Sequence, residues 1–93
     1  MKLKDGHYID EFQNEVWVQD GKYHRVGGPA YIGTDGYMAW CQNGKYHIID
    51  GPARIWPDGS KEYWLNGKYY PQIQNEVQWK MEVQKWKRQQ KED

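Results

Sequence analysis

The sequence predicts a mainly β protein: an antiparallel meander of 23-residue β-hairpin repeats closed by one C-terminal α-helix. A turn glycine preceded by Asp or Asn and followed by Lys-Tyr recurs every 23 residues, at Gly21, Gly44 and Gly67. A fixed period of this length is typical of stacked repeats, in which each unit buries its apolar face against its neighbour. From Gln72 to about Gln90 Gly and Pro are absent, and helix-forming residues dominate.

Two kinds of turn signal divide each repeat. Asp-Gly and Asn-Gly between β-forming residues are typical of type I′ hairpins, because both central residues of such a turn need a positive φ. A Gly-Pro step interrupts each longer interval between these turns, and proline suits a corner because it lacks the N–H that a strand ladder needs. We expect two short strands in each longer interval and one strand in each shorter interval, around residues 37–42 and 60–65.

The chain divides into two parts. Residues 1–71 are expected to form the repeat stack, with a degenerate first copy, two clear copies and a partial third, and residues 72–93 an amphipathic helix. The first copy lacks the Gly-Pro and Asp-Gly signals, as is typical of a capping repeat. Trp17, Trp40 and Tyr63 are one period apart, and we expect their rings to form a column in the β core.

The expected helix is apolar over more than half of its circumference, wider than the stripe of about 100° with which a helix usually faces a core. Two stripes run along it, one of Ile73, Val77 and Met81, the other of Trp79, Val83 and Trp86. Two interpretations are open. The helix closes the open end of the stack and buries both stripes, which is favoured because a bare end strand promotes aggregation. Alternatively, one stripe contacts a partner.

Composition limits the classes of function. Trp and Tyr supply 14 of the 15 aromatic residues, and such side chains cover wide faces in thin β structures and at binding surfaces. A formal net charge of zero gives no overall indication of nucleic-acid or membrane binding. The single cysteine, Cys41, is expected to be a half-buried strand residue and suits a reducing compartment. No stretch approaches the roughly 18 apolar residues of a membrane span, so we expect a cytoplasmic protein.

Residues 40–47 (Trp-Cys-Gln-Asn-Gly-Lys-Tyr-His), 51–53 (Gly-Pro-Ala) and 57–59 (Pro-Asp-Gly) together resemble the MORN repeat. That family has a 23-residue period, a Trp-x-x-Gly-Lys-x-His-Gly-x-Gly core and a following Asp-Gly or Asn-Gly turn. The likeness covers about residues 8–71. Because His-Arg-Val-Gly-Gly-Pro-Ala at 24–30 replaces the His-Gly-x-Gly stretch, the chain looks like a variant associated with phage, bacterial and large-virus proteins of unassigned role.

The resemblance implies a protein partner and brings no catalytic residue and no cofactor. Members of the family act mostly as scaffolds and adaptors that bind proteins, and some are reported to bind membranes, a role that the zero net charge does not favour here. In a phage or bacterial setting, the resemblance implies a small inhibitor or adaptor that binds a host protein, in the host cytoplasm if the protein is viral.

Most residues that could be catalytic or bind a metal are explained as structural positions of the repeat. His24 and His47 are equivalent positions whose third copy is Tyr70, and tyrosine would not replace a zinc ligand, so we expect hydrogen-bonded structural histidines. The sequence has no Cys-His cluster, phosphate-binding glycine loop or Ser-His-Asp order. We therefore expect a protein that is not an enzyme and that holds no metal or cofactor.

Two functions remain open. The first is a protein-binding module that engages a protein partner, or a second copy in a homodimer, through its outer aromatic rows or its helix. The second is nucleic-acid binding by the helix, where basic side chains lie among tryptophans. The candidate binding residues are Trp79, Val83, Trp86, Lys85, Lys87, Arg88, Tyr23, Tyr46 and Tyr69.

Overall fold

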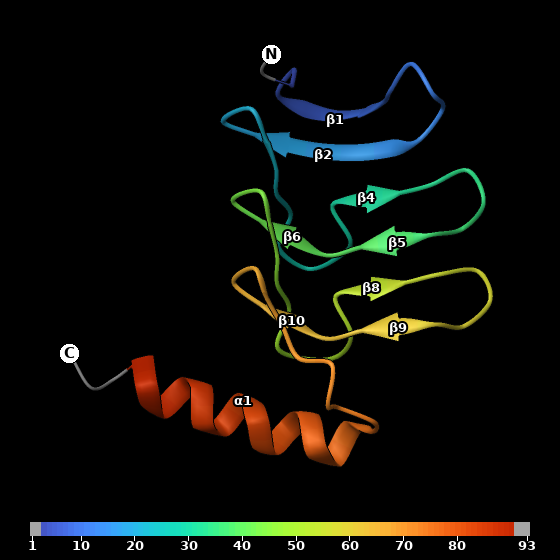
Figure 1. Ribbon diagram of the computed structural model, residues 1–93. Helices are drawn as coiled ribbons and strands as arrows, with labels where there is room; N and C mark the ends of the chain where they lie inside the picture. The colour runs from blue at the N-terminus through green and yellow to red at the C-terminus, as the bar shows by residue number, and fades with distance from the viewer. Residues whose placement is uncertain (1–2, 91–93) are drawn as a thin grey trace.

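The computed structural model describes residues 3–90. Within that range the chain forms short strands stacked as hairpins, with one helix lying across the last of them (Figure 1). The elements are β1 (Gly6–Ile9), β2 (Glu15–Gln19), β3 (Lys22–Tyr23), β4 (Tyr31–Ile32), β5 (Met38–Ala39), β6 (Cys41–Gln42), β7 (Lys45–Tyr46), β8 (Arg54–Ile55), β9 (Lys61–Glu62), β10 (Trp64–Leu65), β11 (Lys68–Tyr69) and α1 (Glu76–Gln90).

The strands form one large sheet and two small ones. The large sheet has the order β1-β2-β4-β5-β8-β9, with β3 also paired to β2, and the two small sheets are the hairpins β6-β7 and β10-β11. Every pairing is antiparallel. The prediction of a mainly β, antiparallel meander followed by a C-terminal helix is therefore confirmed.

The shorter intervals differ from the prediction of one strand each. Both contain two strands, because the chain leaves the large sheet at Trp40 and at Tyr63 and continues into a small hairpin. Trp40 marks this change of sheet. Its N–H donates to the carbonyl of Ala53 in the next unit, and its carbonyl accepts from His47 across the small hairpin. A residue paired on two sides to different segments bends the strand out of one sheet and into the other.

The turns at residues 20–21, 43–44 and 66–67 stack above one another, whereas at 35–36 and 58–59 only the glycine has a positive φ, so these two are not the type I′ turns that were expected. Asn43 (φ 54°) and Gly44 (φ 79°) both have the left-handed conformation of a type I′ turn, as do residues 20–21 and 66–67. The N–H of Gly44 donates to the carbonyl of Tyr23 in the previous unit at 2.9 Å. The turn residues thus set the hairpins and also join consecutive units.

The first unit keeps the repeat's geometry without its sequence signals. Its hairpin is closed by a hydrogen bond from the N–H of Asp10 to the carbonyl of Asn14, as Gly33 bonds to Tyr37 in the next unit. Gln13 (φ 70°) takes the left-handed position that glycine holds in the later copies. The first hairpin thus has the same closing hydrogen bond and the same left-handed position as the hairpin of the next unit.

The core is made of smaller side chains than expected. Ala30 and Ala53 are completely buried, whereas Trp17, Trp40 and Tyr63 are only half-buried. Trp17 stacks on His7 and Tyr63 packs beside Trp79, and no ring contact among the described residues joins Trp17, Trp40 and Tyr63 to one another. The expected central column of rings is therefore wrong. The buried positions between units are held instead by Ala30 and Ala53, whose backbone groups are hydrogen-bonded to the segments on both sides.

The helix closes the end of the stack with one of its two stripes. Trp79 (2% exposed) and Val83 (4%) pack against Leu65 and Tyr70, whereas Val77 and Met81 in the other stripe are 68% and 63% exposed. The expectation that capping buries both stripes is thus wrong for the second. The helix begins at Glu76 and not near residue 72, because Asn75 is its N-cap and accepts from the N–H of Gln78 at 2.9 Å. Of the expected segment 72–93, residues 91–93 lie outside the described residues.

The last repeat has the side chains that a capped end requires. Leu65 and the buried Tyr70 stand where the earlier copies have glutamine and histidine. Both belong to the cluster that packs on the helix. The replacement of His by Tyr at position 70 is therefore explained by burial against Trp79. None of the described residues belongs to a helix with the length and apolar character needed to cross a membrane.

Candidate functional site

The structure divides the predicted binding residues between two places. Trp79 and Val83 are core residues of the helix cap, so they are not available to a partner, and Trp86 is half-buried beside His47 with ring centroids 5.6 Å apart. This part of the predicted site is corrected: the stripe that was expected to contact a partner is needed to close the stack. The basic residues of the helix, by contrast, are exposed, namely Lys85, Lys87 and Arg88.

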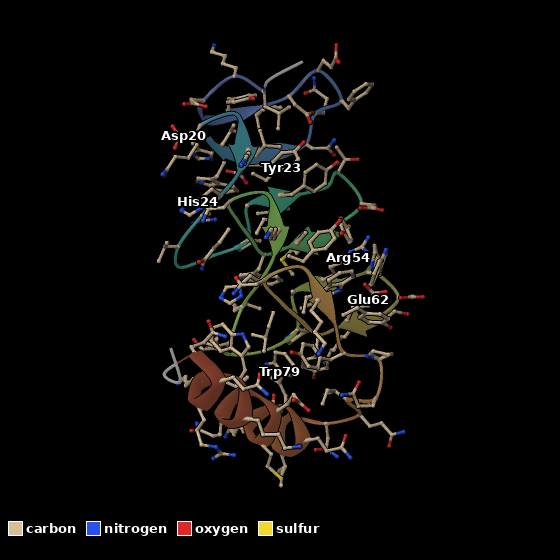
Figure 2. The ribbon with its side chains drawn as sticks, turned by 60° about the vertical axis from the view of Figure 1, so that its left-hand side comes forward. Asp20, Tyr23, His24, Arg54, Glu62 and Trp79 are labelled. Atoms are coloured by element: carbon tan, nitrogen blue, oxygen red, sulfur yellow. The ribbon has the colours of Figure 1, made fainter. Side chains whose placement is uncertain are left out.

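The predicted tyrosines lie on the repeat stack. Tyr23 and Tyr46 line a groove of about 270 Å³ between the large sheet and the small hairpin β6-β7. We call it the aromatic groove; its lining residues are Tyr23, Tyr31, Tyr37, Ala39, Cys41, Tyr46 and Arg54. Figure 2 shows Tyr23, Arg54 and Glu62 along one side of the stack, whereas Trp79 lies at the helix.

The rings of the groove contact one another in two rows. The first row joins Tyr23 to Tyr31, Tyr31 to Tyr37 and Tyr37 to Trp56, with centroid separations of 5.6, 5.9 and 5.4 Å. The second row starts at Tyr46 and continues through Trp64 to Tyr69, with separations of 5.0 and 5.1 Å. Tyr69, which is exposed, ends the second row on the last hairpin and lies outside the residues that line the groove.

Arg54 connects the two rows. Its guanidinium carbon lies 4.6 Å from the ring centre of Tyr46 and 4.5 Å from that of Trp56, and its Nε donates a 2.7 Å hydrogen bond to the hydroxyl of Tyr37. Its Nη1 donates to Oε1 of Glu62 at 3.2 Å, and the indole N–H of Trp64 donates to the same oxygen at 2.9 Å. Stacking of a cation on both rows holds the side chains of the groove in place.

Burial and hydrogen bonding shift the pKa values of the side chains that line the groove. Burial raises the pKa of Tyr23, Tyr31 and Tyr37, so their hydroxyls stay protonated and can donate hydrogen bonds at neutral pH. Burial alone would lower the pKa of Arg54, but its hydrogen bond to Tyr37 and the nearby Glu62 raise the pKa above its ordinary value. The groove therefore offers hydroxyl donors and one permanent cation.

Cys41 forms part of the floor of the groove and is only 4% exposed, more buried than expected. Burial raises the pKa of its thiol to about 11. Because the thiolate is the nucleophile in cysteine chemistry, this side chain acts at neutral pH as a small apolar residue.

The histidines make the structural contacts that were expected. Nδ1 of His24 accepts a hydrogen bond from the N–H of Asn43, and Nδ1 of His47 accepts one from the N–H of Asn66, both at 3.0 Å. Within residues 3–90, no group of three or more His, Cys, Asp or Glu side chains has an arrangement that could hold a metal ion.

Sequence reasoning missed Arg54, Trp56 and Trp64 as site residues. A signal for Arg54 was present, since it stands one period after Tyr31 and two after Tyr8, and so breaks an aromatic position of the repeat. Comparisons with known proteins do not add to the description of the site: no protein-family model, curated protein or solved structure matches the chain.

Proposed function

We propose that this protein is a non-enzymatic binding module that contacts another protein through the aromatic groove. The observation that carries the proposal is the connected set of Tyr and Trp rings, joined by Arg54, on one hollowed face. Tyr, Trp and Arg are the residue types that most often supply the binding energy of protein interfaces. Because the rings and Arg54 already hold one another, binding would cost little side-chain entropy.

The resemblance to the MORN repeat supports the same class of function. Scaffold and adaptor proteins of that family act by binding proteins, and the resembling segment, residues 8–71, contains the whole aromatic groove. If the protein is of phage or bacterial origin, a small inhibitor or adaptor that covers a surface of a host protein is the corresponding role.

Nucleic-acid binding is the second candidate, because Lys85, Lys87 and Arg88 are exposed on the last turns of the helix. Stacking of bases on the helix tryptophans has weaker support, since Trp79 is buried and Trp86 packs beside His47. Electrostatic contact with phosphates would remain, and such binding falls steeply as salt is raised.

The test is affinity capture from the native cell with matched variants. Tyr46→Ala removes a ring from the groove, Tyr69→Ala removes one from the row that continues beside the groove, and Met81→Ala, on the exposed helix stripe, is the control. We expect a specific protein to be captured by the native chain and by Met81→Ala, and to be lost with Tyr46→Ala. Circular dichroism of each variant is the check that the variant is folded.

Two results would contradict the proposal. One is a protein partner that Tyr46→Ala and Tyr69→Ala bind as well as the native chain does. The other is low-salt binding to nucleic acid that the triple Gln variant of Lys85, Lys87 and Arg88 abolishes and that Tyr46→Ala leaves unchanged. Measuring the mass in solution alongside distinguishes a second copy of the chain from a different partner.

A further inference from the structure

One cross-strand position separates the third repeat from the first two. The pairs at this position are Tyr8–Val16 in the first unit, Tyr31–Ala39 in the second and Arg54–Glu62 in the third. The first two pairs combine a tyrosine with an apolar residue, as stacking of units requires. In the third, both partners are charged, so the repeat scheme does not explain this pair.

The edge of the sheet explains Glu62 but not Arg54. β9 is the last strand of the large sheet, and charged side chains are common on edge strands because they discourage pairing with other chains. β8, which carries Arg54, is paired on both sides, to β5 and β9. The guanidinium of Arg54 lies over the rings of Tyr46 and Trp56, and Arg54 lines the groove.

Arg54 has hydrogen-bond donors to spare. A guanidinium has five N–H groups, and contacts with described residues occupy its Nε and Nη1. Its Nη2 has no hydrogen-bond partner among the described residues, and because none of their side-chain N or O atoms is both buried and without a partner, Nη2 reaches solvent. Glu62 is bound through Oε1 alone, which it shares with Trp64.

The chemistry of this free nitrogen identifies the ligand group. Nη2 carries two N–H donors and part of the positive charge of the guanidinium, which suit an oxygen of a carboxylate. Of the seven residues that line the groove, Arg54 is the charged one, and the pKa of the tyrosines keeps their hydroxyls as neutral donors. Glu62 already offsets the charge of Arg54. The attraction between Arg54 and an incoming carboxylate therefore acts only at short range, where it depends on how the carboxylate is oriented.

We propose that the aromatic groove binds an acidic segment of the partner protein, in which an Asp or Glu carboxylate accepts a hydrogen bond from Nη2 of Arg54, beside the rings of Tyr46 and Trp56. This inference rests on the proposed function of the groove and names the chemistry of its partner. The apolar parts of the same segment would pack against the tyrosine rings on either side.

The test uses two short peptides that differ in one group. N-acetyl-Gly-Glu-Gly-amide and N-acetyl-Gly-Gln-Gly-amide are titrated into isotopically labelled protein, and the NMR signals of the Arg54 Nε–H and the Trp56 and Trp64 indole N–H groups are followed. We expect saturable shifts with the Glu peptide and an affinity about tenfold lower with the Gln peptide, as for loss of one charge-assisted hydrogen bond.

Matched variants isolate Arg54. Arg54→Gln and Lys61→Gln each remove one positive charge, but Lys61 is exposed and lies outside the groove. Binding of the Glu peptide should disappear with Arg54→Gln and persist with Lys61→Gln. Equal affinity for the two peptides, or unchanged binding by Arg54→Gln, would overturn the inference. Inorganic phosphate that binds as tightly as the Glu peptide would also overturn it, since the site would then be a general anion site.

Failure of this inference can be distinguished from failure of the proposed function. Suppose that Tyr46→Ala loses the partner, while Arg54→Gln and Lys61→Gln capture it equally well. The groove is then the interface, but the partner does not bind Arg54 through a carboxylate. A partner that Tyr46→Ala still captures refutes the groove itself.

Discussion

The backbone N–H of Asn66 donates a 3.0 Å hydrogen bond to Nδ1 of His47, which belongs to the preceding repeat unit. The same bond joins Asn43 to His24, and at the start of the stack the carboxylate of Asp5 accepts from the N–H groups of Asp20 and Gly21. Each turn is thus held by an acceptor from the segment before it. An Nδ1 that accepts a hydrogen bond belongs to a neutral imidazole with its proton on Nε2.

Acid should therefore weaken the stack through His47. Burial lowers the pKa of His47 in the folded protein below its ordinary value of 6.5, so the unfolded chain binds the proton more readily. Its contribution to the free energy of unfolding is complete above pH 6.5 and is lost as the pH falls through the folded pKa.

Urea unfolding from pH 8 to pH 5 measures this effect. The pH dependence should be smaller in His47→Gln, by an amount on the order of one hydrogen bond, about 1 kcal/mol. An identical pH dependence in the native chain and in His47→Gln would show that His47 does not couple protonation to stability.

The helix cap depends on Trp79. Its ring is buried between Tyr63 and Tyr70, with centroid separations of 5.0 and 5.5 Å, and its indole N–H donates to the carbonyl of Ile49. Trp79→Ala should lower the free energy of unfolding by about 3–5 kcal/mol. Val77→Ala, on the exposed stripe, should change it by less than about 0.5 kcal/mol. Equal effects in denaturant unfolding would mean that the helix does not cap the stack.

Two glycines of different role make a second matched pair. Gly44 has a φ of 79°, and a Cβ there would lie 3.4 Å from the side chain of Lys22 in the previous unit. Gly44→Ala should therefore destabilise the protein by about 1 kcal/mol or more. A Cβ at Gly51 would have no atom of another residue within 4 Å apart from its chain neighbours, and its φ is not positive. Gly51→Ala should therefore be neutral or stabilise the protein by about 0.4–1 kcal/mol. Thermal unfolding compares the two.

Cys41 should react slowly while the protein is folded. With its pKa raised from 9.0 to about 11, the thiolate fraction near pH 8 is about a hundredfold lower than in the unfolded chain. The rate of disulfide exchange with a chromogenic reagent, with and without denaturant, measures this ratio. A fast reaction in native buffer would mean that the floor of the groove opens readily.

Local chemistry allowed much of the fold to be predicted. The conformation of an Asn-Gly turn depends on two adjacent residues, so the positions of the hairpins follow from the repeat alone. The helix segment was likewise evident from its composition. The change of sheet at Trp40 was not, because the hydrogen bond to Ala53 that bends the chain joins residues 13 positions apart in different units.

The candidate site was less predictable than the fold. Tyr23, Tyr46 and Tyr69 were expected on the outer surface, and the structure places the first two in the groove and the third beside Trp64. Trp79 has the same amphipathic character as these tyrosines. Only packing against Leu65 and Tyr70 distinguishes it as a core residue.

By itself, the sequence determined the positions of the turns and the presence of a helix after the β region, because these depend on backbone preferences within a few residues. The tertiary structure decided which aromatic faces are covered and which remain open. It also decided that Arg54 lies between two rows of rings, because that arrangement brings together side chains from β3, β4, β7 and β8, whose residues are far apart in the chain.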